Sequence, residues 1–333
     1  MHALQHINNI DIQPSLFLLK EGDDSLFTSE SVSTYLSYMK ACILEHPEWD
    51  DYQKYTNPYE YIYNYFVYKP ISQSYFKMIE IAHYFKLLSA THPIKTLHLA
   101  NGHGFVEAIH NLRKNKSDAH LALSSFNPGW DFLRVDSGID GTGNIMNQQN
   151  LHHFMQLEKM DIITGDGPCD NNFIATQTLY ALLLQKKSGT YILKAHDLFE
   201  RSIVELIYLL CMCYRQVFIY KPMASRAANS EKYIICNDFI YDSLAHMKEP
   251  FVKLITSLVH LEKFNLLSVQ LPLLFITKIN EINSILAQPQ VDNIKTTIAL
   301  IRTQNIPKLE NMKQIHIKKC QEWCIKHTST SYT

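Results

Sequence analysis

The sequence lacks several features that would each point to a class of protein. Its formal net charge is only −1, so binding to nucleic acid through overall positive charge is excluded, and any such contact needs a local patch. Its seven cysteines include no CxxC pair, so the chain has no zinc-site pattern. This usage is typical of reduced cysteines in an intracellular protein.

Long apolar runs are also missing. The N-terminal stretch MHALQHINNIDIQ has no basic region followed by an apolar one, so no secretory signal is predicted. The longest apolar runs, 203–214 and 271–279, are too short to cross a bilayer. Hydrophobic residues make up 46% of the chain and charged residues 19%, which is typical of a folded globular protein of 333 residues.

Strand and helix patterns alternate between about residues 94 and 214. Short apolar segments predict buried strands at the start of 94–105 and over 119–125, 160–166 and 189–195. Helical spacing is present in 71–88, 175–187 and 198–214. This alternation predicts an α/β fold with a mostly parallel sheet and helices on both faces.

The segments after residue 214 follow a different pattern. Two more strands, 216–222 and 231–239, are joined by a loop too short for a helical crossover, so we expect an antiparallel pair at one edge of the sheet. From about 240 to 327 the pattern is helical, and the QPQ sequence at 288–290 predicts a break between helices.

Charged residues stand at the ends of the predicted strands. Asp166 ends one strand, Lys194 lies near the end of the next, Glu231 begins the last strand, and Lys77 lies on the helix that enters the domain. Ligands of open α/β sheets bind beyond the carboxyl ends of the strands. Each charge alone is explained by a solvated salt bridge, but the four together predict a site with two ammonium groups and two carboxylates.

A turn with two glycines follows the first predicted strand and consists of Asn101, Gly102, His103, Gly104 and Phe105. Glycine lets a ligand approach the backbone, and the start of the following helix offers free N–H groups. Two glycines in a turn are common, so an ordinary tight turn explains this stretch equally well.

The order of these motifs resembles the FtsJ-like RNA 2′-O-methyltransferases, which use S-adenosylmethionine and a Lys-Asp-Lys-Glu tetrad. The resemblance covers about residues 65–240 and is closest to the eukaryotic and large-DNA-virus branch, which methylates the first or second transcribed nucleotide of capped mRNA. It is carried by SQSYFKMIEI (72–81), GIDGTGNIMNQQN (138–150), GTYILKAHDLF (189–199) and, most specifically, YKPMASRAANSEKYIIC (220–236).

The resemblance implies a role for each candidate residue. Lys194 would take the proton of the ribose 2′-hydroxyl within a catalytic tetrad of Lys77, Asp166, Lys194 and Glu231, and no metal ion is needed. The residues implied to bind S-adenosylmethionine are Asn101, Gly102, His103, Gly104, Phe105, Asn144, Ile145 and Asp166. Those implied to bind RNA are Lys221, Ser225, Arg226 and Asn229.

The resemblance also implies a division of the chain. We expect a Rossmann-like methyltransferase domain over 69–240, between an N-terminal extension (1–68) that is a candidate cap- or RNA-binding segment and a helical C-terminal extension (241–333). The expected partners are a capped RNA substrate and other capping or transcription proteins, with no membrane. The expected location is intracellular, in the cytoplasm (a viral factory if the chain is viral) rather than the nucleus.

Two residues depart from the family's pattern. His103 stands where the family's turn has glycine, and its side chain either faces the methionine part of the cofactor or points to solvent. Asn144 replaces an acid; its amide can bond an adenine or ribose edge but brings no charge. Two alternatives to a cap-specific enzyme stay open: a methyltransferase of ribosomal or transfer RNA, and a catalytically silent subunit that binds RNA or a capping protein.

Overall fold

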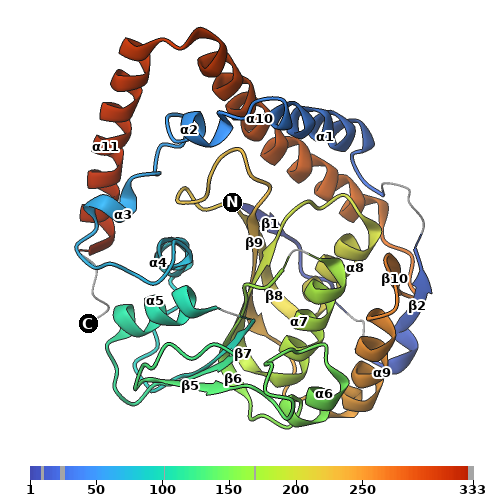
Figure 1. The fold of residues 1–333 in the computed structure, drawn as a ribbon. Helices are drawn as coiled ribbons and strands as arrows, with labels where there is room; N and C mark the ends of the chain where they lie inside the picture. Colours follow the sequence, from blue (N-terminus) through green and yellow to red (C-terminus); the bar gives the residue numbers. More distant parts are fainter. Residues whose placement is uncertain (9–10, 23–26, 101, 169, 329–333) are drawn as a thin grey trace.

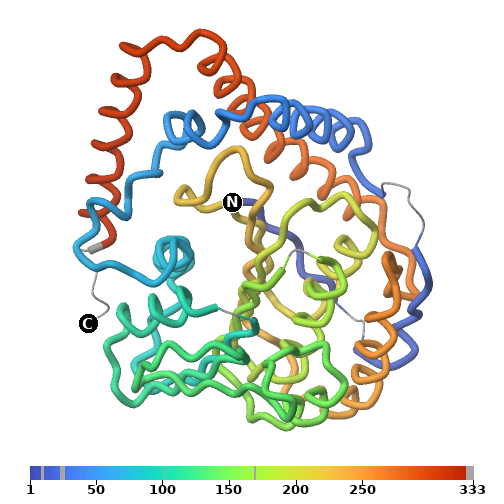
Figure 2. Tube along the Cα trace, viewed as in Figure 1, coloured from blue at the N-terminus to red at the C-terminus, as the bar shows by residue number. Residues whose placement is uncertain are grey.

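The computed structural model describes residues 1–8, 11–22, 27–100, 102–168 and 170–328 (Figures 1 and 2). Within them, an eight-stranded sheet has the order β1-β8-β9-β7-β6-β3-β4-β5. Its strands are β1 (His2–Leu4), β3 (Lys95–Leu99), β4 (Ala119–Leu123), β5 (Leu133–Asp136), β6 (Met160–Gly165), β7 (Gln185–Ala195), β8 (Tyr214–Tyr220) and β9 (Lys232–Phe239). The predicted Rossmann-like α/β architecture is confirmed.

The parallel part of the sheet runs from β5 through β4, β3 and β6 to β7. The chain adds β4 and β5 on one side of β3 and later adds β6 and β7 on the other side. The order of the strands therefore reverses between β3 and β6. In a sheet of this kind, the crevice beyond the strand ends at that point is where ligands bind.

Alternation along the strands builds two hydrophobic cores, one on each face. On β7, the side chains of Tyr191 and Leu193 lie in one core and that of Ile192 lies in the other. The helices α4 (Ser74–Phe85) and α5 (His103–Arg113) cover one face. The other face is covered by α7 (Asn171–Leu184) and α8 (Arg201–Cys213), and α6 (Gln148–Phe154) lies beside them (Figure 1).

The two late strands pair as predicted, but not at the rim of the sheet. β8 and β9 are antiparallel, and β9 lies between β8 and β7. The rim is formed by β1, whose three residues pair with β8. The N-terminal extension thus contributes a strand to the central sheet, and the boundaries expected at residues 68 and 240 stay a prediction.

The C-terminal region is helical as expected, except at two points. The predicted break at 288–290 is wrong, because α10 (Leu273–Thr303) continues through Pro289 and is capped at its C-terminus by Gln304, which has a φ of 47°. Proline removes one backbone hydrogen bond, and side chains before and after it, Ala287 and Val291, are buried against α1. A short strand, β10 (Phe264–Leu267), pairs with β2 (Phe17–Glu21) in a second sheet.

The N-terminal and C-terminal regions run together along one side of the molecule. Helix α1 (Glu30–Leu44) lies beside α10, and α3 (Ile62–Tyr65) lies beside α11 (Ile306–Thr328) (Figures 1 and 2). Of the two remaining helices, α2 (Trp49–Gln53) lies beside α10, and α9 (Lys248–Leu258) packs against α7 and α6. Among the described residues, none of the helices combines the length and the apolar character that crossing a bilayer requires.

Candidate active site

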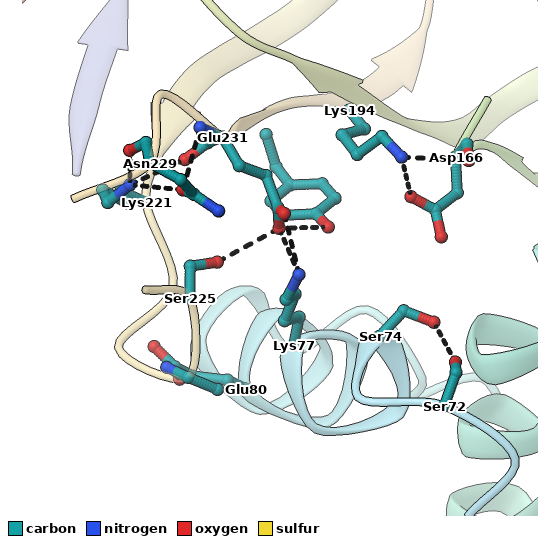
Figure 3. A network of polar contacts seen from close by, with 12 residues as sticks. Ser72, Ser74, Lys77, Glu80, Asp166, Lys194, Lys221, Ser225, Asn229 and Glu231 are labelled. Atoms are coloured by element: carbon teal, nitrogen blue, oxygen red, sulfur yellow. Dashed lines mark hydrogen bonds and ion pairs between the residues drawn. The ribbon is translucent and has the colours of Figure 1, made fainter. Parts of the chain in front are cut away.

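The four predicted charged residues form two ion pairs at the carboxyl edge of the sheet. The ammonium of Lys77 lies 2.6 Å from Oε1 and 2.8 Å from Oε2 of Glu231. The ammonium of Lys194 lies 2.9 Å from Oδ1 of Asp166 and donates to its backbone oxygen at 3.1 Å. All four side chains are between 11% and 19% exposed, so they are nearly buried but reachable (Figure 3).

The strand topology explains how these residues meet. Asp166 follows the end of β6, and Lys194 lies near the end of β7, which is parallel to β6. Glu231 comes just before β9; because β9 is antiparallel to β7, its beginning lies beside the end of β7. Lys77 reaches the same edge from α4, as Figure 3 shows. Four residues far apart in the sequence are thus held by four different elements.

The two carboxylates have pKa values shifted in opposite directions. Burial raises the pKa of Asp166, and this effect outweighs the opposing attraction of Lys194 and Lys77. Burial also acts to raise the pKa of Glu231, but Lys77 and the hydroxyl of Tyr233 together outweigh it, so the pKa of Glu231 is lowered. The ionised form of Glu231 is therefore the better stabilised of the two.

Residues 221–231, which connect β8 to β9, form a loop that is fastened to α4 at both ends. Near its beginning, the buried carboxylate of Glu80 accepts hydrogen bonds from the backbone N–H groups of Met223 (2.7 Å) and Ala224 (3.1 Å) and from the hydroxyl of Tyr220. At its end, Lys77 holds Glu231. Because Lys77 and Glu80 are three residues apart, they lie on the same face of α4, and each binds one end of the loop.

The predicted RNA-binding residues all lie in this loop, and they differ in what they contact. Lys221 points inward, and its ammonium donates to Asn229 O (2.6 Å), Asn229 Oδ1 (3.1 Å) and Glu231 O (3.1 Å). Burial lowers the pKa of Lys221 to about 7. The hydroxyl of Ser225 donates to Glu231 Oε1 at 3.2 Å. Arg226 is exposed at the surface.

The turn after β3 lies where the cofactor was predicted. Asn101 is outside the described residues; Gly102 is the N-cap of α5, and a Cβ there would lie only 3.3 Å from the Cβ of His98. Gly104 is packed closely, since a Cβ would come within 2.2 Å of Ser74 Oγ. Phe105 is buried with its ring 5.7 Å from that of Tyr233, so its side chain serves the core.

The His103 side chain does not point to solvent, one of the two orientations expected from the sequence, and the other, toward the methionine part of the cofactor, stays a prediction. Its side chain is buried, with Nε2 placed 3.1 Å from the backbone oxygen of Phe126. The rings of Phe126 and Trp130 meet it edge to face at 5.1 and 6.4 Å. The imidazole is therefore packed under the 126–130 loop, and it is not exposed to solvent.

The loop over 138–145 is organised by Asp140. Its carboxylate accepts hydrogen bonds from Thr142 and Asn150, and these bonds lower the pKa of Asp140. Asn144 is exposed, and its Oδ1 accepts from the backbone N–H of Met146 at 2.9 Å. Ile145 is completely buried in the core. Of the two cofactor candidates here, only Asn144 presents its side chain at the surface.

The comparison with known proteins agrees with this geometry. A model of the FtsJ-like methyltransferase family matches residues 70–239, about half of the 333-residue chain. This protein belongs to that family. The FtsJ-like domain includes both ion pairs, the loop over 221–231 and the turn after β3.

Curated relatives of this FtsJ-like protein carry cap-specific names. Cap-specific mRNA (nucleoside-2′-O-)-methyltransferase 2 of Danio rerio is 27% identical over 309 residues, 78% of this chain and 41% of that protein. The corresponding methyltransferase 1 of Trypanosoma cruzi is 31% identical over 41% of this chain and 40% of its own length. For the human methyltransferase 1, the identity is 32% over 30% of this chain and 14% of that protein. The chain therefore spans less than half the length of these relatives.

Three supporting residues of the FtsJ-like site were not found from the sequence. In the sequence, only its position one turn after Lys77 distinguishes Glu80 from other glutamates. Asn57 and Glu60 lie outside the matched range, yet both contact the loop: Asn57 Oδ1 accepts from the N–H of Ala227 (3.1 Å), and Glu60 pairs with Arg226 (2.7 Å). Only the folded chain brings these residues together.

Proposed function

We propose that this protein methylates a ribose 2′-hydroxyl of capped mRNA with S-adenosylmethionine as the methyl donor. The observation that carries the proposal is the pair of lysine–carboxylate contacts, Lys194 with Asp166 and Lys77 with Glu231, at the carboxyl edge of an FtsJ-like domain. The cap-specific names of the relatives support capped RNA as the substrate, especially because the similarity to the Danio rerio protein covers 78% of this chain.

In the proposed reaction, Lys194 is the base. Its nitrogen is held by two oxygens of Asp166, so in the neutral amine that a base requires, the remaining position on Nζ is a lone pair that can accept the hydrogen of a substrate hydroxyl. A base within hydrogen-bond reach would take up the hydroxyl proton as the oxygen forms its bond to the methyl carbon and the bond from that carbon to sulfur breaks, with S-adenosylhomocysteine as the leaving product. Asp166 fixes the direction of Nζ, and alignment of this kind makes a large contribution to transfer reactions.

Lys77 and Glu231 act on the other side of the site. Glu231 holds the ammonium of Lys77, and it is held in turn by the hydroxyls of Ser225 and Tyr233 at 3.2 and 2.9 Å. With both charges so fixed, Lys77 is available to position the ribose. Its positive charge also acts on Asp166, where it opposes the rise in pKa that burial causes.

The residues around the turn fit the proposed cofactor. S-adenosylmethionine supplies a methyl group bonded to a cationic sulfur, and the Asp166 carboxylate suits that charge. Gly102 keeps the turn close to β3, since a Cβ there would meet His98. The N-terminus of α5, directly after the turn, suits the methionine carboxylate. Asn144 would bond the adenine or ribose edge.

The test is methyl incorporation from labelled S-adenosylmethionine into a short capped RNA. Nuclease digestion and mass analysis of the product would identify the methylated ribose. We expect incorporation by the wild type and loss of it in Lys194→Ala and also in Lys194→Arg, because arginine keeps the charge but cannot act as a base. Undiminished incorporation by either variant would refute the role of Lys194.

Two further comparisons separate the alternatives. Capped and uncapped RNA of the same sequence distinguish a cap-specific enzyme from one that acts on ribosomal or transfer RNA. A rise in melting temperature on adding S-adenosylmethionine shows that the folded protein binds the cofactor. A wild type that binds capped RNA without this rise and without incorporation would be a silent RNA-binding subunit.

A further inference from the structure

A carboxylate from outside the FtsJ-like domain holds the exposed arginine of the 221–231 loop. Glu60 binds Arg226 through two contacts, Oε1 to Nη2 at 2.7 Å and Oε2 to Nε at 3.2 Å. The Glu60 side chain is 15% exposed and that of Arg226 is 42% exposed. The carboxylate is thus nearly buried, while the guanidinium stands with its outer side in solvent.

Glu60 is itself held in place. The amide of Asn57 donates to Glu60 Oε2 at 3.2 Å, and its oxygen accepts from the backbone N–H of Ala227 at 3.1 Å. Asn57 is 3% exposed, so its amide lies in the interior and is held there by these two hydrogen bonds. On the far side of the loop, Gln290 of α10 donates to Ala228 O at 2.7 Å. Neither Asn57 nor Gln290 lies within the matched range of 70–239.

The geometry leaves one edge of the guanidinium open. Glu60 takes the Nε–H and one N–H of Nη2, so both N–H groups of Nη1 and one of Nη2 remain. In the part of the chain that the structure describes, Nη1 has no partner. A planar guanidinium bound by a carboxylate on one edge is well suited to bind a phosphate with the other.

We propose that Glu60 is a positioning residue for RNA: it holds Arg226 by one edge so that the free edge faces a phosphate next to the methylated ribose. The inference rests on the proposed function, which supplies RNA as the ligand. Ser225, the residue before Arg226, is bonded to Glu231, so the phosphate contact and the catalytic carboxylate belong to the same loop. The N-terminal segment thereby becomes part of the RNA site.

The proposal predicts that RNA binding weakens when Glu60 is lost. An argument from charge alone predicts the opposite, so the two can be distinguished by experiment. Removing a carboxylate from beside an RNA site reduces repulsion of the phosphates and strengthens binding. The same result follows if Glu60 merely occupies Arg226 and must leave before RNA binds. Weaker binding by a Glu60→Gln protein that keeps the wild-type melting temperature is expected only if the carboxylate orients the arginine.

The experiment measures fluorescence anisotropy of a short m⁷G-capped RNA, labelled at its 3′ end, with the full chain and S-adenosylhomocysteine. We expect Glu60→Gln to bind on the order of fivefold more weakly and Arg226→Ala on the order of tenfold more weakly. The double variant should match Arg226→Ala, because Glu60 acts through Arg226. The control is Glu262→Gln, the same change at an exposed residue between α9 and β10, and it should bind like the wild type.

If the Glu60→Gln protein folds poorly, a second variant still tests the inference. Arg226→Lys keeps the charge but loses the planar fork, so it should bind nearly as weakly as Arg226→Ala, with a salt slope lower by about 0.7 for the lost phosphate contact on single-stranded RNA. Binding of Arg226→Lys or of Glu60→Gln equal to or tighter than wild type would overturn the inference. So would a double variant weaker than Arg226→Ala by the full Glu60→Gln factor.

The binding assay keeps this inference separate from the proposed reaction. A wild type that binds capped RNA without methylating it would refute the reaction, and the Glu60 comparison would still decide the positioning role. A wild type that methylates RNA with an unaffected Glu60→Gln variant would refute the positioning role alone. A wild type with no affinity for RNA would refute both.

Discussion

Glu80→Gln tests whether the loop over 221–231 depends on α4. The carboxylate accepts from the backbone N–H groups of Met223 and Ala224 and from the Tyr220 hydroxyl, and its side chain is buried. Glutamine has the same shape but only one acceptor oxygen. In either amide orientation, its NH₂ group would face at least one backbone N–H of the loop, and two donors would meet without an acceptor between them.

The expected loss of stability follows from the number of hydrogen bonds that the substitution removes. Losing one charge-assisted hydrogen bond and leaving a buried N–H without a partner costs about 2–3 kcal/mol. For a chain of 333 residues, with an unfolding entropy of about 2.1 cal/mol/K per residue, this corresponds to a drop in melting temperature of roughly 3–4 °C. Because the loop carries Ser225 and Glu231, methyl incorporation should fall as well.

The assays are thermal unfolding and methyl incorporation into capped RNA. Glu262→Gln is the matched control, and we expect it to change the free energy of unfolding by no more than about 0.5 kcal/mol because the side chain is exposed. If Glu80→Gln kept both the wild-type melting temperature and the wild-type activity, the loop would not depend on this carboxylate, and our account of its anchoring would be wrong.

Three further predictions concern the site. Asp166→Asn should lower kcat about 100-fold and leave the KM for RNA nearly unchanged, because the base loses its orienting charge; an unchanged kcat in steady-state assays would contradict this. The pKa of Glu231 is lowered from its ordinary value of 4.5 in the folded chain, so its stabilisation is fully present above pH 4.5 and is lost as the pH falls through the lowered pKa; melting curves of the wild type and Glu231→Gln should differ at pH 7 and approach each other as the pH falls below 4.5. Gly143→Ala should cost more stability than Gly141→Ala, because both have positive φ but only at Gly143 does a Cβ come within 2.4 Å of the Ser124 backbone; equal melting temperatures would refute this.

The tetrad could be predicted from the sequence because it follows from a topological rule. Residues at the carboxyl ends of parallel strands meet at one edge, so Asp166 and Lys194 are brought together by strand order alone. The antiparallel return of β9 places Glu231 at the same edge. The pairing of each lysine with its carboxylate needed the fold, because Lys77 comes from a helix.

The supports of the site could not be predicted, because they depend on contacts between distant segments. Glu80 and Met223 are 143 residues apart, and Glu60 and Arg226 are 166 residues apart. Nothing in the local pattern around Glu60 or Asn57 indicates such a partner. The break predicted at Pro289 failed for a similar reason, since packing of α10 against α1 compensates for the one hydrogen bond that proline removes.

The 221–231 loop is held at three places, and these contacts couple ligand binding at the loop to the local opening of the outer helices. Asn57 from the N-terminal region, Glu80 from α4 and Gln290 from α10 all bond to its backbone. A ligand that orders this loop therefore also stabilises the outer helices, because binding and local opening share one equilibrium. On the proposed function, sequence changes in α10 or in residues 57–60 would thus tune RNA affinity from outside the family domain.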